Sequence, residues 1–261
     1  MLIDTHCHLD FPEIAADIGG VMERARAAGV GRMITISTRV KKYEVYRALA
    51  EQNDNVWFTV GTHPHQAHEE PDVTAADLVA LAAHPRCIGI GEAGLDYHYD
   101  KSPRDVAAKV FRTHIAAARE SGLPLVIHSR DADEDMAAIL RDEMGKGRFN
   151  ALLHCFTSSR ELAQTAIDLG LYVSFSGVLT FKNSQGLREI AADMPMDRVL
   201  VETDAPFLAP TPHRGKPNQP AYVTETNRVL GETKGLMAEE IASKTTTNAL
   251  RIFNKMPMGF E

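Results

Sequence analysis

Cysteine is scarce in this sequence of 261 residues, which holds only Cys7, Cys87 and Cys155. An odd set without regular spacing does not form a disulfide framework, so we expect free thiols and a reducing compartment. Long apolar stretches are missing as well. None approaches the roughly 18 uncharged apolar residues of a membrane span, and the first residues lack the charged and apolar parts of a secretory signal peptide. These absences predict a cytoplasmic protein without a membrane segment.

Positive charge is also in short supply. The chain has 28 Lys and Arg against 35 Asp and Glu, a formal net charge of -7. A protein that holds a long nucleic-acid duplex by electrostatics alone is expected to be basic. Any contact with phosphate groups must therefore come from a few local Arg or Lys side chains or from bound metal. With 44% hydrophobic and 24% charged residues, the composition is that of a globular protein with an ordinary core.

What the sequence does contain is a regular alternation of short apolar segments with amphipathic ones. The apolar segments, which are typical of buried parallel strands, cover residues 1–6, 32–37, 56–61, 87–92, 124–129, 151–156, 171–177 and 198–204. Helical spacing is found at 14–28, 41–52, 75–83, 104–121, 132–144, 159–169, 184–192, 222–230 and 238–253. Eight strand–helix units in a chain of this length predict an α/β fold, a TIM (β/α)8 barrel, as a single domain over residues 1–261.

Two histidines mark the end of the first predicted strand, in the stretch IDTHCHLD at 3–10. Residues two apart on a strand face the same side, so His6 and His8 point together while Cys7 points toward the helix layer. The carboxyl ends of barrel strands form the active face. A lone histidine on an apolar strand is more often a core residue, but a pair on one face at this end indicates a functional site.

Four more polar residues end other apolar segments on the same side. They are Glu92, His128, His154 and Asp204. With the histidine pair they make four imidazoles and two carboxylates, a set that suits Zn²⁺, Mn²⁺ or Fe²⁺. Six ligands are too many for one tetrahedral ion with an open position, whereas two ions that share a carboxylate and a water use them all. We therefore predict a site for two divalent cations. Cys7 and Cys155, each next to a ligand, are predicted to be small core residues on the opposite face.

Other polar residues lie close to these strand ends. His63 and His65 follow the third strand and are predicted to hold substrate phosphate, with solvated loop residues as the alternative. Arg130 is predicted to bind a phosphate with two hydrogen bonds, or else to form a salt bridge to Glu92 or Glu202. Glu202 itself is predicted to orient a ligand histidine.

Three further side chains have weaker patterns. Tyr97 and Phe156 are placed to stack on bases, although aromatic residues near strand ends more often serve packing. His114 is predicted to lie on a helix surface.

Six ordered blocks of the sequence resemble one known family. They are THCHLD (5–10), GTHPH (61–65), GEAGLDY (91–97), IHSRDA (127–132), HCF (154–156) and ETDAPFL (202–208). They are similar to the TatD family of metal-dependent hydrolases, TIM barrels related to the amidohydrolases, and the resemblance extends to residues 245–253. It implies that His6, His8, Glu92 and Asp204 surround one metal. Glu92 is then shared with a second metal, which His128 and His154 complete.

The resemblance also implies an activity. Members of the family are deoxyribonucleases, so we expect hydrolysis of phosphodiester bonds in DNA, from single-stranded 3′ ends, by two-metal activation of a bridging water with Mg²⁺, Mn²⁺ or Zn²⁺. Glu92 and Asp204 are the expected catalytic residues, with Asp204 either the proton acceptor or a ligand only. A monomer is expected. The sequence departs from the family pattern at Ser158, where glycine is usual, and at Pro217, where a basic residue is common.

The residues leave the substrate open. The same barrel and metals also suit a small phosphoester, a lactone or an amide. Glu92 stands at the end of the fourth strand, where a carbamate-bridged amidohydrolase needs lysine, so that subgroup is disfavoured. A binding scaffold without activity is a third reading, against which six intact ligands argue.

Overall fold

The computed structural model describes residues 1–259, and its eight strands form one parallel sheet in chain order. The strands are β1 (Leu2–Cys7), β2 (Val30–Thr35), β3 (Val56–Val60), β4 (Cys87–Asp96), β5 (Leu125–Arg130), β6 (Ala151–Leu153), β7 (Tyr172–Phe175) and β8 (Val199–Val201). Backbone contacts close the ring between β1 and the segment after β8, where Cys7 bridges Ala205 and the Asp204 amide donates to the His6 carbonyl at 2.8 Å. The predicted barrel is confirmed.

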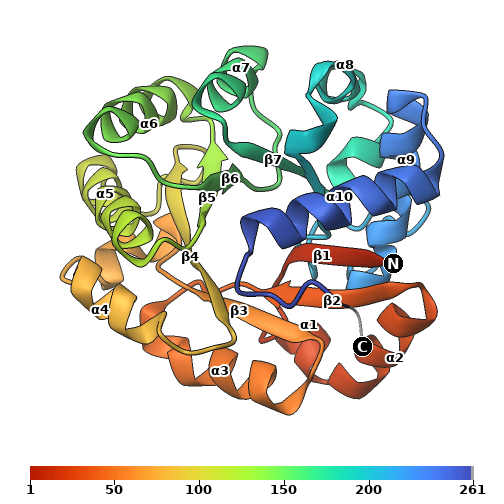
Figure 1. Cartoon of the computed structure of the whole chain (residues 1–261), viewed down its shortest axis with the longest axis horizontal. Coiled ribbons are helices and arrows are strands. Elements are labelled where there is room, and N and C mark those ends of the chain that lie inside the picture. The colour runs from red at the N-terminus through yellow and green to blue at the C-terminus, as the bar shows by residue number, and fades with distance from the viewer. Residues whose placement is uncertain (260–261) are drawn as a thin grey trace.

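Helices surround the strands on the outside (Figure 1). They are α1 (Pro12–Ala15), α2 (Ile18–Ala27), α3 (Tyr43–Gln52), α4 (Ala75–Leu81), α5 (Arg104–Ser121), α6 (Asp133–Lys146), α7 (Arg160–Leu169), α8 (Gln185–Asp193), α9 (Val223–Lys234) and α10 (Ala238–Ile252). Short 3-10 helices are η1 (Val40–Lys42), η2 (Pro64–Glu69), η3 (Gly177–Thr180), η4 (Met196–Arg198) and η5 (Pro220–Tyr222).

The helix predicted over 14–28 is divided in two. Asp17 accepts a hydrogen bond from the Gly20 amide at 3.2 Å through its side chain, which makes it the N-cap of α2. An N-cap residue has non-helical backbone angles, so the first turn ends as the separate helix α1.

The interior of the barrel has its own apolar core, separate from the layer between strands and helices. Strand residues such as Ile3, Ile34, Ile88 and Leu200 fill it together with side chains from α10 and the residues after it, among them the fully buried Phe253. Figure 1 shows α10 crossing the strands.

Contacts of the C-terminal segment show which end of the barrel it covers. Thr246 donates to the Met1 carbonyl at 2.9 Å, and Lys255 donates to the Cys87 carbonyl at 2.9 Å. Both acceptors lie where strands begin, so α10 closes the amino-terminal end and leaves the carboxyl ends of the strands open. None of the helices within residues 1–259 combines the length and apolarity needed to cross a bilayer.

Candidate metal centre

The first of two groups of ligand atoms gathers between the ends of β1 and β8. The Nε2 atom of His6 lies 3.3 Å from Nε2 of His8, 3.3 Å from Oε2 of Glu92 and 3.5 Å from Oδ1 of Asp204. The same Asp204 oxygen lies 3.4 Å from Nε2 of His8. His6 is fully buried, whereas the Asp204 side chain is 14% exposed and opens the group to solvent.

The second group forms around the other oxygen of Glu92. Its Oε1 atom lies 2.8 Å from Nδ1 of His128 and 2.8 Å from Nε2 of His154. These two ring nitrogens are themselves 3.3 Å apart. The Glu92 carboxylate therefore stands between the two groups with one oxygen turned to each, and the six residues predicted from the strand ends come together in the structure.

Neighbouring acceptors fix which nitrogen of each histidine is free. Nδ1 of His8 lies 3.3 Å from the Ile36 carbonyl, and Nδ1 of His154 lies 3.1 Å from Oε1 of Glu202. A carbonyl or carboxylate accepts a hydrogen bond, so the protons sit on these nitrogens and the lone pairs on Nε2 point into the groups. Glu202 also accepts from the Cys155 amide at 2.8 Å. The contact with a ligand histidine that the sequence predicted for Glu202 is present.

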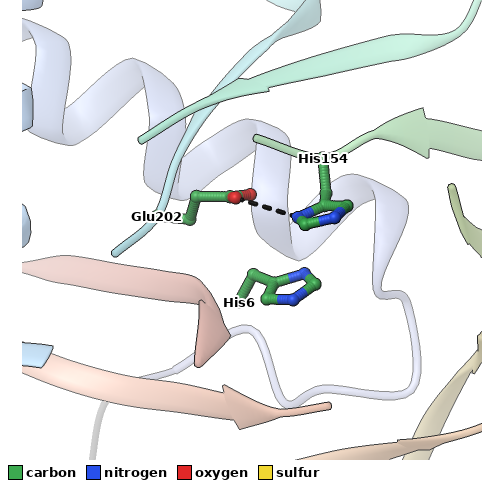
Figure 2. A group of neighbouring side chains, drawn as sticks. All are labelled: His6, His154 and Glu202. Atoms are coloured by element: carbon green, nitrogen blue, oxygen red, sulfur yellow. Dashed lines mark hydrogen bonds and ion pairs between the residues drawn. The ribbon is translucent and has the colours of Figure 1, made fainter. Parts of the chain in front are cut away.

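Figure 2 shows the contact between His154 and Glu202, with the His6 ring packed against His154. The rings of His6 and His154 are stacked, with centroids 3.8 Å apart and planes at 10°. Within the described residues, Nδ1 of His6, Oε2 of Glu92 and Oε2 of Glu202 are buried without a hydrogen-bond partner. Convergent lone pairs and unpartnered buried carboxylate oxygens are costly in a protein interior. Divalent cations relieve both, and the nitrogen and oxygen donors fit such ions.

Asp96 is a residue of this site that the sequence did not predict. Its Oδ2 atom accepts from Nε2 of His128 at 3.0 Å and from Nε2 of His65 at 2.8 Å. The proton of His128 is thereby held on Nε2, which leaves Nδ1 to face Glu92. Asp96 comes four residues after Glu92 in the same strand, and the two-residue period of strands was the signal that could have found it.

His63 and His65 differ in their roles at the rim. Nε2 of His63 lies 3.4 Å from Oε1 of Glu92, while its Nδ1 accepts from the His65 amide at 3.1 Å. The neutral ring therefore carries its proton on Nε2, which makes His63 a hydrogen-bond donor toward the site rather than a ligand. His65 points its ring at Asp96 and helps to fix that carboxylate.

The electrostatics follow from burial and from this packing of opposite charges. Burial raises the pKa of Glu92, but the charge of His154 and the hydrogen bond from His128 outweigh it and hold that pKa well below its usual range. Burial lowers the pKa of His63 to about 4. The ring of His63 is thus neutral near pH 7, in keeping with its hydrogen bonds.

Arg130 does not form the predicted salt bridge. Among residues 1–259 its guanidinium pairs with no carboxylate and lies instead 4.9 Å from the ring centroid of Tyr99. It lines a cleft of about 880 Å³ among the loops that follow β4, β5 and β6. Four acidic residues line the same cleft, at 131 and 133–135. A polyanion is therefore attracted there only next to Arg130 and Arg104.

Several expectations for single residues are wrong. Phe156 is 3% exposed and packs near Phe175, so it cannot stack on a base. Cys155 is only half-buried and lies 3.0 Å from the Ser176 hydroxyl, because its left-handed backbone (φ 42°) turns it out of the strand pattern. Cys7 is buried in the outer core as expected.

His114 is also not on the surface. It is fully buried in α5, its Nε2 accepts from the Thr62 amide at 2.9 Å, and its Nδ1 donates to the Val110 carbonyl at 2.8 Å. The histidine therefore ties α5 to the segment that carries His63.

Comparisons with known proteins find relatives over nearly the whole chain. A model of the family described as TatD related DNase matches residues 3–254. The chain is 42% identical to a Bacillus subtilis protein named as an uncharacterized metal-dependent hydrolase, YabD, over 97% of this chain and 99% of that one. It is 36% identical to the 3′-5′ ssDNA/RNA exonuclease TatD of Erwinia tasmaniensis, over 97% and 100%. Among solved structures, the TatD homologue YjjV of Escherichia coli superposes with a TM-score of 0.90 at 30% identity, over 98% of each chain.

Proposed function

We propose, from the premise that this chain belongs to the TatD family of metal-dependent hydrolases, that it hydrolyses phosphodiester bonds of DNA from single-stranded 3′ ends. The carrying observation is the buried Glu92 carboxylate, which faces a separate group of imidazole nitrogens with each oxygen. The name of the Erwinia relative as a 3′-5′ ssDNA/RNA exonuclease supports the substrate class.

The ligand assignment follows the two groups. His6, His8, Glu92 and Asp204 would hold one divalent ion, Mg²⁺, Mn²⁺ or Zn²⁺, and Glu92, His128 and His154 a second. When bound, such ions would supply an acidified water as nucleophile and would polarise a phosphoryl oxygen.

The chain's own residues do the remaining work. Glu92 fixes the spacing of the two groups. Asp204, the more exposed of the two carboxylates at 14% against 1%, accepts the proton of the attacking water. His63 donates from Nε2 to a phosphate oxygen, and Arg130 binds a neighbouring phosphate with its planar guanidinium. His65 donates a hydrogen bond to Asp96 and so holds in place the carboxylate that orients His128.

One set of assays tests this function. Protein stripped of metal and refilled with Mg²⁺, Mn²⁺ or Zn²⁺ is given 3′- and 5′-labelled single- and double-stranded DNA, single-stranded RNA, and panels of small phosphoesters, lactones and amides. We expect metal-dependent loss of nucleotides from single-stranded 3′ ends. Turnover of small substrates alone would overturn the nuclease assignment, and metal binding without any turnover would leave only a scaffold.

A substitution shows whether the measured activity comes from this site or from a contaminating nuclease. Glu92→Gln keeps the shape of the side chain and removes the charge that both groups share. We expect a fall in kcat/KM of more than ~100-fold, because a shared ligand should matter more than the residues that orient ligands. Glu44→Gln, at an exposed glutamate of α3, is the matched control and should retain activity.

A further inference from the structure

Two exposed aromatic side chains flank the metal centre. In the part of the chain that the structure describes, Tyr99 and Phe207 are the exposed large apolar residues that carry aromatic rings, at 53% and 46% exposure. Tyr99 lies in the loop after β4 and Phe207 in the loop after β8. Strands four apart in a closed ring of eight lie opposite each other, so the loops that carry the two rings stand on opposite sides of the open end of the barrel.

The loop of Phe207 is held firmly against the first group. The Phe207 amide donates to the Asp204 carbonyl at 2.9 Å. The buried Asn218 donates from Nδ2 to the carbonyls of Phe207 and Thr203, at 2.7 and 2.8 Å. The Phe207 ring meets the Phe11 ring edge-on at 5.5 Å and lies 6.1 Å from the His8 ring. A large apolar surface is thus kept in water beside a ligand histidine by a fixed backbone.

Tyr99 has the equivalent place beside the second group. Its amide donates to Oδ1 of Asp96 at 2.8 Å, so the carboxylate that orients His128 also fixes the Tyr99 backbone. The Tyr99 ring lies 5.2 Å from the His65 ring, and the Arg130 guanidinium is 4.9 Å from its centroid. An aromatic surface and a cation for phosphate therefore occur together at this side.

We propose that Phe207 and Tyr99 are stacking platforms for the bases of the two nucleotides on either side of the scissile phosphate. This inference rests on the proposed function. Every base has a π-face, so such platforms tolerate any sequence. In a duplex the bases are paired and stacked on each other, so their faces are not available to a protein ring. The pair of platforms therefore selects a single-stranded end of at least two nucleotides.

A binding experiment tests the platforms without turnover. The metal-loaded protein is mixed with single-stranded DNA in which a methylene group replaces the bridging ester oxygen at the terminal linkages. The fluorescent base 2-aminopurine stands at the last or the next-to-last position, and stacking quenches its emission. We expect quenching at both positions in the wild type. Phe207→Leu should relieve it at one position and Tyr99→Leu at the other.

A kinetic experiment uses natural linkages and compares a normal substrate with one that lacks the base at the position identified by fluorescence. Each Leu variant should lose roughly tenfold in kcat/KM on the normal substrate, the size expected for one base–aromatic stack. The loss should vanish on the abasic substrate. Phe207→Trp should retain both activity and quenching, and Met237→Ala, at the exposed start of α10, is the matched control for loss of an apolar surface residue.

The possible outcomes are separable. Equal losses on normal and abasic substrates, or quenching unchanged by either Leu variant, would overturn the platforms while the nuclease function stands. A wild-type protein that cleaves no nucleic acid with any of the three metals would overturn the proposed function and the platforms together.

Discussion

At the scale of single residues, the orientation of the histidines in the candidate metal centre depends on acceptor groups behind them. Three histidines of the proposed metal centre have their second nitrogen hydrogen-bonded to an acceptor of the protein: the Ile36 carbonyl for His8, Asp96 for His128 and Glu202 for His154. These contacts select the tautomer before any ion arrives. Such partners are as important to metal affinity as ring position.

Asp96→Asn tests this role. In the wild type, Oδ2 of Asp96 accepts from His65 and His128 and Oδ1 accepts from the Tyr99 amide. The asparagine side chain has only one acceptor oxygen, so its NH2 group must face at least one of these three donors. We expect Mn²⁺ affinity to fall by about 10- to 100-fold, measured by isothermal titration calorimetry. Glu134→Gln, in the first turn of α6, should leave the affinity unchanged. Unaltered Mn²⁺ binding by Asp96→Asn would show that His128 is oriented by its packing alone.

Some of the individual site residues could be predicted from the sequence and others could not. The six strand-end residues were predictable because the two-residue period of strands and the common edge of a barrel bring such positions together. Their gathering is observed, and their role as ligands stays a prediction. Asp96 and the buried position of His114 were not predictable in this way. Each depends on which side chain of a neighbouring element lies opposite, which no local pattern contains.

At the scale of elements, α5 is linked to the segment after β3 through one buried neutral histidine. Burial lowers the pKa of His114 to about 4 from its ordinary value of 6.5. Between these values the unfolded chain binds a proton that the folded one does not, so the free energy of unfolding falls as pH falls through this window. The loss of stability begins below about pH 6.5 and reaches roughly 3 kcal/mol at pH 4.

His114→Gln should remove this dependence. The variant is expected to be less stable at pH 7, because a buried ring is lost, but to lose about 3 kcal/mol less than the wild type between pH 7 and pH 4. Urea unfolding at a series of pH values measures the difference. Thr113→Ala, which removes no ionisable group from α5, should follow the wild-type slope. Parallel curves for His114→Gln and the wild type would contradict a buried neutral His114.

The floor of the barrel is a second element-scale feature. Phe253 is fully buried among the inward-facing strand residues, so Phe253→Ala leaves a cavity that the closed ring cannot fill. We expect the free energy of unfolding to fall by about 3–5 kcal/mol, as measured by urea denaturation. Met237→Ala at the exposed start of α10 should change it by less than ~0.5 kcal/mol. A small effect of Phe253→Ala would mean that α10 is only loosely attached.

The elements themselves were largely predictable. The eight strands and the later helices come from apolar runs and helical spacing that local sequence carries. The division of α1 from α2 needed the side-chain cap of Asp17. The position of α10 could not be predicted, because the pattern of an amphipathic helix does not indicate which apolar surface it packs against. In the structure α10 packs against the interior of the barrel.

At the scale of the whole molecule, the metal centre is expected to contribute to stability. The ligands come from strands all round the ring, and ions that bind only the folded protein shift the unfolding equilibrium by about 2.7 kcal/mol at a hundredfold excess over Kd. Treatment with a chelator should therefore lower Tm, and Mn²⁺ should restore it. The Glu92→Gln variant should respond less to either. An identical Tm with and without chelator would count against ions held by these residues.

Ring closure gives the order of chain synthesis a consequence. The first group takes His6 and His8 from the opening strand and Asp204 from beyond the final one. A polypeptide still emerging from the ribosome, or one that ends before residue 204, has these histidines without Asp204. Under the proposed function, such an enzyme has no nuclease activity while it is being translated. It becomes active only when the segment after β8 has paired with β1.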